Sequence, residues 1–163
     1  MRHPSELTNS IIKLREKLKK SHCRWVKIIY SIKYQRLCGR LNCFIPVSAA
    51  IPESTIFPHG LNGVYISQGA ILGESCVVFH QVTIGSNSLK DSKGFGSPKL
   101  GNNVYIGAGA KIIGGIKIGN NVRIGANVVV TNDIPDNSTV VAVPARLILH
   151  DEERKNTFNP YQK

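Results

Sequence analysis

An apolar side chain returns every six residues through most of the chain, and this spacing constrains the fold more than any other feature. The first position of each hexapeptide is apolar throughout. These positions are Ile45, Ile51, Phe57, Ile66, Leu72, Val78, Ile84, Leu100, Ile106, Ile112, Ile118, Ile124 and Val130. The fifth position carries small or β-branched residues such as Ala49, Cys76 and Val104. A period of six suits neither an α-helix nor irregular hairpins.

The pattern instead predicts an all-β repeat protein, a parallel β-helix built from short strands. Each hexapeptide would form one flat face, with its first residue pointing inward. Gly or Asn in the following positions would let the backbone turn through positive φ at little steric cost. Cys76 falls on an inward fifth position, so we interpret it as a small core residue and not as a nucleophile.

The repeat run resembles the hexapeptide-repeat acyltransferases, through motifs such as "LGNNVY", "IGAGAK", "IGNNVR" and "IGANVV". The segments "GVYISQGAILGESCVVFHQVTIG" and "PKLGNNVYIGAGAKIIGGIKIGNNVRIGANVVV", closing on "VPARLI", look like the serine acetyltransferase branch and its polysaccharide-modifying relatives. This resemblance implies a left-handed β-helix with three hexapeptides per coil. It also implies acetyl-CoA as co-substrate and a homotrimer with the cofactor between neighbouring subunits. We expect no metal.

The chain divides into three predicted parts: a basic amphipathic helical segment (1–43), the β-helix acyltransferase domain (44–148), and a polar tail (149–163). The net charge is +11, but residues 1–40 hold 11 Lys or Arg against two Glu, so most of it lies in the first part. There, apolar residues recur with helical spacing and predict one helix from about residue 9 to about residue 37. They are Ile11, Leu14, Leu18, Trp25, Ile29 and Ile32.

We favour a helix packed on its own domain or on a sister subunit. A basic amphipathic helix can also lie on an anionic membrane surface, which is the less favoured interpretation. The basic run lacks the spaced aromatic residues of a single-strand stacking platform, so we expect no nucleic-acid partner.

The remaining sequence signals favour a cytoplasmic protein. The N-terminal stretch "MRHPSELTNS" is polar, and no apolar run reaches the about 18 residues that a spanning helix needs. The four cysteines lack paired metal-ligand spacing, and we expect them to be reduced thiols.

Both histidines of the repeat region fall in one column of the predicted prism. With three hexapeptides per coil, the repeats that begin at 57, 78, 106 and 124 share a side, and their third positions are His59, His80, Ala108 and Ala126. Adjacent coils lie about 5 Å apart. Two imidazoles followed by a track of small residues leave room for a long thin ligand whose reactive end reaches the histidines.

Two interruptions of the repeat lie near this column. Three extra residues fall at about 60–63, directly after His59, and the polar segment "SNSLKDSKGFGSPK" (86–99) separates Ile84 from Leu100. We predict that the longer insertion projects from the prism as a loop. Loops on a rigid scaffold are frequent positions for functional sites.

Acetyl transfer to an alcohol needs a base that works near neutral pH, and imidazole has a suitable unperturbed pKa. By resemblance, His59 occupies the catalytic-histidine position. His80 is the weaker catalytic candidate, either lining the acceptor pocket or structural. The resemblance further places cofactor contacts at Gly85, Ser86, Ala108, Gly109, Arg123, Ala126 and Arg146, and acceptor contacts at Pro58, Asn62 and Lys99.

The acceptor side departs from the serine acetyltransferase pattern. In that family an aspartate directly precedes the catalytic histidine and an Arg-His pair precedes the "PK" of the loop. Here those positions are Pro58 and the pair Gly96 and Ser97, and "FIPV" (44–47) supplies no second carboxylate. An amino-acid pocket normally provides a cation and an anion. We therefore expect a hydroxyl of a sugar or bacterial surface glycan, such as a capsule or O-antigen.

Three alternatives stay open at this point. Lysines 90, 93 and 99 could replace the missing cation, so serine is the alternative acceptor. A γ-type carbonic anhydrase shares the predicted fold, but its zinc site needs three histidines, and the repeat region has two with no H-x4-H pair. The last alternative is a β-helix without catalytic activity.

Overall fold

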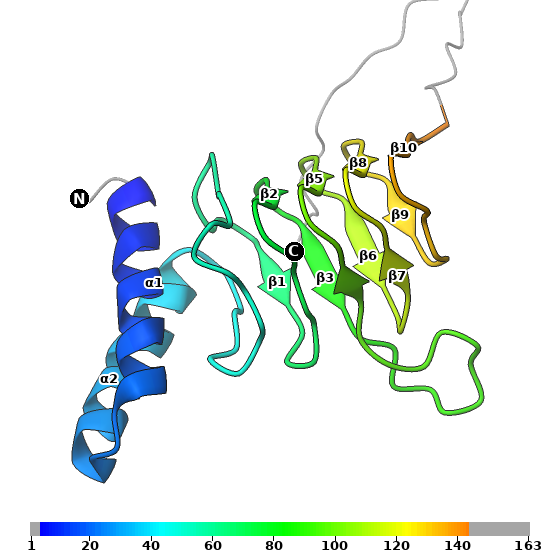
Figure 1. Cartoon of the computed structure of the whole chain (residues 1–163). Coiled ribbons are helices and arrows are strands. Elements are labelled where there is room, and N and C mark those ends of the chain that lie inside the picture. The colour runs from blue at the N-terminus through cyan, green and yellow to red at the C-terminus, as the bar shows by residue number, and fades with distance from the viewer. Residues whose placement is uncertain (1–3, 144–163) are drawn as a thin grey trace, which may run out of the picture.

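The computed structural model describes residues 4–143, which form a pair of helices followed by a three-sided coil of short strands (Figure 1). The helices are α1 (Pro4–Lys20) and α2 (Arg24–Arg40). The strands are β1 (Tyr65–Ile66), β2 (Val77–Val78), β3 (Thr83–Gly85), β4 (Lys99–Leu100), β5 (Tyr105–Ile106), β6 (Lys111–Ile113), β7 (Lys117–Ile118), β8 (Arg123–Ile124), β9 (Val129–Val130) and β10 (Thr139–Val140). The predicted end of the β-helix at 148 and the tail 149–163 lie outside the described residues.

The strands form three parallel sheets, one on each side of a prism. Their orders are β1-β3-β6-β9, β2-β5-β8-β10 and β4-β7, so no strand pairs with its neighbour along the chain. The chain therefore passes from side to side and stacks each strand on the equivalent strand of the previous coil. This is the parallel β-helix that the six-residue period predicted, with the left-handed coil that the family resemblance implied.

The sequence separation between paired residues shows how many residues each interruption adds to its coil. In regular coils the partners are eighteen residues apart, as Tyr65 with Thr83 and Lys99 with Lys117. Phe44 pairs with Tyr65, twenty-one residues later, which confirms the three extra residues beside His59. The loop at 86–99 lengthens its coil by ten residues, because Val77 pairs with Tyr105.

The interior is filled by the two predicted sets of side chains. The first-position residues are buried, except that Ile51 and Phe57 are half-buried in the first described coil. The fifth-position residues, including Ala49, Cys76 and Val104, are also buried. Burial raises the pKa of the Cys76 thiol, which agrees with its interpretation as a core residue.

The turns differ in part from the sequence expectation. Positive φ occurs at the fourth position of the repeats, for example at Asn103 and Asn121, both with φ 55°. Gly101, in the second position, has no positive φ. A Cβ there would lie 2.8 Å from the carbonyl carbon of Gly119 in the next coil. Glycine in the second position is therefore required by the close stacking of coils and not by the turn.

The N-terminal segment is a helical hairpin, so the prediction of one helix over residues 9–37 is wrong. Helix α1 ends at Lys20, and Cys23, with extended φ of −75° and ψ of 122°, precedes α2. Because the chain reverses there, the apolar residues do not form one stripe. Ile11, Leu14 and Leu18 are buried on α1. On α2 the buried residues are instead Tyr34, Leu37 and Cys38.

Helix α1 is joined to the first coil by a buried arginine. The guanidinium of Arg15 donates hydrogen bonds to the carbonyl oxygens of Pro46, at 3.3 Å, and Ala49, and it pairs with Glu16 at 3.3 Å. Burial lowers the pKa of Arg15, but these acceptors satisfy the buried cation. The helices thus cap the open end of the coil, and their core residues are continuous with the interior of the prism. Of the two favoured alternatives, packing on its own domain or on a sister subunit, the first agrees with these contacts.

Asparagine side chains form a ladder along one edge. The Asn103 amide donates to Oδ1 of Asn121 at 3.0 Å, and the Asn121 amide donates to Oδ1 of Asn137 at 2.9 Å. All three residues have positive φ. Asparagine tolerates this conformation better than most residues and also provides a donor and an acceptor for the neighbouring coils.

We predict that Asn121→Ala destabilises the protein more than Asn121→Gly. Both changes remove the two ladder bonds, but only alanine strains the left-handed backbone, which costs about 1 kcal/mol more. Urea unfolding of the two variants measures the difference. Equal free energies of unfolding would contradict the assignment of strain to this position.

Candidate active site

His59 and His80 meet at one corner of the prism, in adjacent coils, as the column argument predicted. Their Nδ1 atoms are 3.0 Å apart, and their ring centroids are 5.0 Å apart with the planes tilted by 35°. The Phe79 ring packs edge-on against His59, with centroids 5.1 Å apart. The two imidazoles are therefore held against each other at a partly solvent-accessible corner.

The Nδ1 contact determines how neutral rings can share protons. One ring must donate its Nδ1–H, and the other must accept it. The donating ring then has a free lone pair at Nε2, whereas the accepting ring carries its hydrogen at Nε2. The pair therefore presents one base and one hydrogen-bond donor at the same corner, which are groups that general acid–base catalysis uses.

The three extra residues form a turn that holds His59. Gly60 and Gly63 adopt positive φ of 71° and 65°, and the amide of Asn62 donates to the carbonyl oxygen of His59 at 3.1 Å. Leu61 is fully buried, and its N–H donates to the hydroxyl oxygen of Thr8 on α1 at 3.0 Å. The insertion is thus anchored in the core and tied to the helical hairpin.

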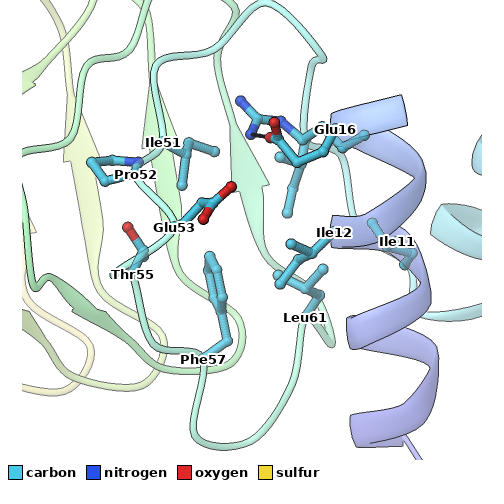
Figure 2. A pocket seen from close by; sticks show the side chains of 11 residues that line it. Ile11, Ile12, Glu16, Ile51, Pro52, Glu53, Thr55, Phe57 and Leu61 are labelled. Atoms are coloured by element: carbon cyan, nitrogen blue, oxygen red, sulfur yellow. Dashed lines mark hydrogen bonds and ion pairs between the residues drawn. The ribbon is translucent and has the colours of Figure 1, made fainter. Parts of the chain in front are cut away.

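Helix α1 also packs against the coil segment that carries His59. Ile12 extends from α1 toward Phe57 and Leu61, which flank the histidine in sequence (Figure 2). A cavity of about 30 Å³ remains between the helix and the coil, bordered by the buried Thr55. The position of His59 therefore depends on packing between two parts of the chain that are about 50 residues apart.

An open groove of about 530 Å³ lies beside His80. Its lining residues are Arg40, Leu41, Asn42, Asn62, Gly63, Tyr65, His80, Gln81, Thr83 and Lys111. None of them is acidic. The Lys111 ammonium donates to the carbonyl oxygens of Gln81 and Gly109, both at 2.8 Å, so it is engaged by backbone. Arg40 has no ion-pair partner among residues 4–143.

The coil is similar in sequence to known proteins. The family model "Bacterial transferase hexapeptide (six repeats)" matches residues 97–132. Serine acetyltransferase of Synechococcus elongatus is 44% identical over 114 residues, which cover 70% of this chain and 46% of that protein. Serine acetyltransferase of Helicobacter pylori strain J99 is 42% identical over 103 residues, 63% of this chain and 58% of that protein.

Residues 97–132 of the coil thus match the repeat of the hexapeptide transferase family. Solved structures of serine acetyltransferases are similar over most of this chain. Neisseria gonorrhoeae serine acetyltransferase in complex with serine has a TM-score of 0.68 and 31% identity, covering 84% of this chain and 55% of that chain. Brucella abortus serine acetyltransferase in complex with coenzyme A has a TM-score of 0.68 and 29% identity, covering 84% and 54%. The chain thus spans about half the length of the relatives it matches.

Two of the predicted cofactor residues, Ala108 and Gly109, lie in the coil that follows His80. Ala108 and Ala126 continue the histidine column, and the N–H of Asn127 donates to the carbonyl oxygen of Ala108 at 2.9 Å. The N–H of Gly109 donates to the carbonyl oxygen of His80 at 3.0 Å. Gly85 ends β3, and the Ser86 hydroxyl lies 2.7 Å from the Ser97 hydroxyl at the base of the projecting loop.

Other predicted site residues lie elsewhere or outside the described part of the chain. Lys99 is on β4, a different side of the prism, and borders a depression with Asp133 and Asp136. Arg123 begins β8 and is exposed. Pro58 is exposed directly before His59, whereas Arg146 lies outside the described residues. Within residues 4–143, no three His, Cys, Asp or Glu side chains are grouped to hold a metal.

Sequence reasoning missed the two cations of the groove. The position of Lys111 could have been predicted. A coil of eighteen residues, lengthened by the loop insertion, places Lys111 beside Thr83, which also lines the groove. The position of Arg40 could not, because this residue ends α2 and reaches the groove only through the packing of the hairpin on the first coil.

We predict that Thr8→Val lowers the free energy of unfolding by about 1–3 kcal/mol, because the buried N–H of Leu61 loses its acceptor. Thr8→Ser keeps the hydroxyl and is the matched control. Denaturant unfolding of both variants provides the measurement. A valine variant as stable as the serine variant would show that the hydrogen bond does not hold the turn.

Proposed function

We propose that this chain is an acetyl-CoA-dependent O-acetyltransferase whose acceptor is serine. The observation that carries the proposal is the paired imidazoles of His59 and His80 at the head of a column of small residues. The curated relatives are named serine acetyltransferase, and one of the similar structures is a complex with serine. The residue pattern on the acceptor side favoured a glycan, but the comparisons with known proteins support the alternative acceptor, serine, better.

The proposed mechanism uses His59 as the general base. We assign the shared proton to Nδ1 of His59, so that its Nε2 lone pair is free. This nitrogen takes the proton of the acceptor hydroxyl while the hydroxyl oxygen attacks the thioester carbonyl carbon of acetyl-CoA. The C–O bond forms, the C–S bond then breaks, and the CoA thiolate receives the proton from His59. His80 accepts the Nδ1–H and fixes the ring.

The co-substrate is proposed to run along the column of small residues from the histidine pair. Ala108, Gly109 and Ala126 leave this corner free of large side chains, and one of the similar structures holds coenzyme A. We further propose contacts at Gly85, Ser86, Arg123 and Arg146, and a homotrimer in which a neighbouring subunit covers the column.

Arg40 supports serine as the acceptor. Its guanidinium lines the groove beside His80 and has no ion-pair partner among the described residues, so it is available to bind a carboxylate by two parallel hydrogen bonds. It would replace the Arg-His pair that the loop lacks at Gly96 and Ser97.

A neutral sugar hydroxyl is the second candidate, and one observation favours it. The groove contains no carboxylate to match the ammonium of serine, and the residue before His59 is Pro58. A CoA-release assay with serine and with a panel of sugars and bacterial glycans decides between them. Turnover with serine supports the main proposal, and turnover with a sugar alone replaces it by the second.

We predict that His59→Ala lowers kcat by about a thousandfold, within the usual range for loss of a general base. His80→Ala should cost less, because it removes the group that orients the base. His80→Asn should recover part of the loss, since its side-chain oxygen can accept the Nδ1–H of His59. CoA release under saturating substrates measures kcat. Unchanged turnover in His59→Ala would remove this residue from the mechanism.

We also predict that Arg40→Ala raises the KM for serine by about tenfold or more, as expected when a charged hydrogen bond is lost. The KM for acetyl-CoA should stay the same. Lys20→Ala, which removes an exposed cation outside the groove, is the control. An equal effect of both variants would indicate a general loss of charge and not a carboxylate contact.

A further inference from the structure

Helix α2 has two apolar faces, and only one of them is covered. Tyr34, Leu37 and Cys38 are buried against the rest of the chain. The opposite side carries Trp25, Ile28, Ile29 and Ile32, which are 75%, 42%, 63% and 48% exposed; we call these four residues the tryptophan face. Their spacing of three, four and seven residues places them in one stripe. Contiguous exposed apolar surface of this kind indicates an interaction site.

Exposed cations surround the tryptophan face. Arg24 lies four residues before Ile28, and Lys33 and Arg36 lie four residues after Ile29 and Ile32, so all three flank or extend the stripe. Helix α2 contains no acidic residue, and none of these cations has an ion-pair partner within residues 4–143. The partner of this face must therefore offer both apolar and negatively charged groups.

The position of the helices leaves this face accessible. Both helices lie together at one end of the prism, away from the last coils (Figure 1). The side chains that α2 directs toward α1 and the first coil are those of its other face. The stripe is therefore not part of the core that joins the hairpin to the prism.

We propose that the tryptophan face binds the surface of an anionic phospholipid membrane. The helix would lie parallel to the surface, with the isoleucines and the indole at the boundary between headgroups and acyl chains. Tryptophan is well suited to this boundary, because its ring is apolar and its N–H is polar. Arg24, Lys33 and Arg36 would contact lipid phosphates. None of the described helices is long and apolar enough to cross a membrane.

Two other partners fit the face less well. A symmetric contact with a second copy would bring the same cations of both chains together without a carboxylate on either helix. A nucleic acid would satisfy the cations, but it offers little to three exposed isoleucines, and only one aromatic residue is present for stacking. Both are outcomes of the test below. The inference does not depend on which acceptor the transferase uses.

Sedimentation of the full chain with vesicles tests the proposal. Neutral phosphatidylcholine vesicles are compared with vesicles that contain phosphatidylglycerol at about 0.1 M salt, where exposed charges still interact over about 10 Å. We expect binding to the anionic vesicles alone, weakened as salt rises. No binding to anionic vesicles, or equal binding to neutral ones, would overturn the proposal.

Matched variants connect the binding to this face. Trp25→Ser/Ile29→Ser and Lys33→Glu/Arg36→Glu should each reduce the vesicle-bound fraction about tenfold or more, the first by removing apolar contact and the second by reversing charge. Leu89→Ser and Lys90→Glu/Lys93→Glu make the same kinds of change on exposed residues of the 86–99 loop and should have no effect. Circular dichroism verifies folding, and the charge reversal alters no apolar contact.

Two results would assign the face to another partner. A fall in particle mass of the Trp25→Ser/Ile29→Ser variant by light scattering, with vesicle binding unchanged, would make it a subunit contact. Binding to duplex DNA that the charge-reversal variant loses, without binding to anionic vesicles, would make it a nucleic-acid surface. Either result overturns the membrane proposal.

Discussion

Hydrogen bonds between successive coils hold this molecule together, and they form only when the backbone returns to the same side of the prism after each turn. The eighteen-residue register from Tyr65 to Thr83 and from Lys99 to Lys117 is the direct result. Close stacking also explains the second-position glycines, since a Cβ on Gly101 would meet the backbone of the next coil. Aliphatic first positions fill the interior, because they are the side chains that every face directs inward.

The candidate site is built where this regular stacking is broken. Coil stacking places His80 one layer from His59 and puts Ala108 and Ala126 in the following layers. The three-residue insertion after His59 leaves the regular path but buries Leu61, whose N–H is bound by Thr8. A rigid prism thus supplies the spacing of the imidazoles, and the helical hairpin supports the turn that carries one of them.

Prediction from sequence succeeded for the repeat region. The buried position of Cys76 follows from counting by six. The three sheets and the column of His59, His80, Ala108 and Ala126 follow once the family resemblance supplies three hexapeptides per coil. It failed for the N-terminal segment. The apolar residues from Ile11 to Ile32 share a helical period, but nothing in that period indicates that the chain reverses near Cys23. Prediction from sequence also expected positive φ at the Gly and Asn positions of each turn in general. In the structure, positive φ occurs mainly at the fourth position of the hexapeptide.

The sequence by itself determined which side chains point into the coil, because a constant six-residue period directs the same positions inward on every face. With the three-hexapeptide coil that the family resemblance implies, it also placed the two histidines in one column. The tertiary structure alone decided the Nδ1 contact between the rings, the hydrogen bond from Leu61 to Thr8, the position of Arg40 in the groove and the exposure of the tryptophan face. Each of these depends on how a non-repeating segment packs against the coil or against itself. Such packing is set by the shapes of side chains that are distant in sequence, which no local period encodes.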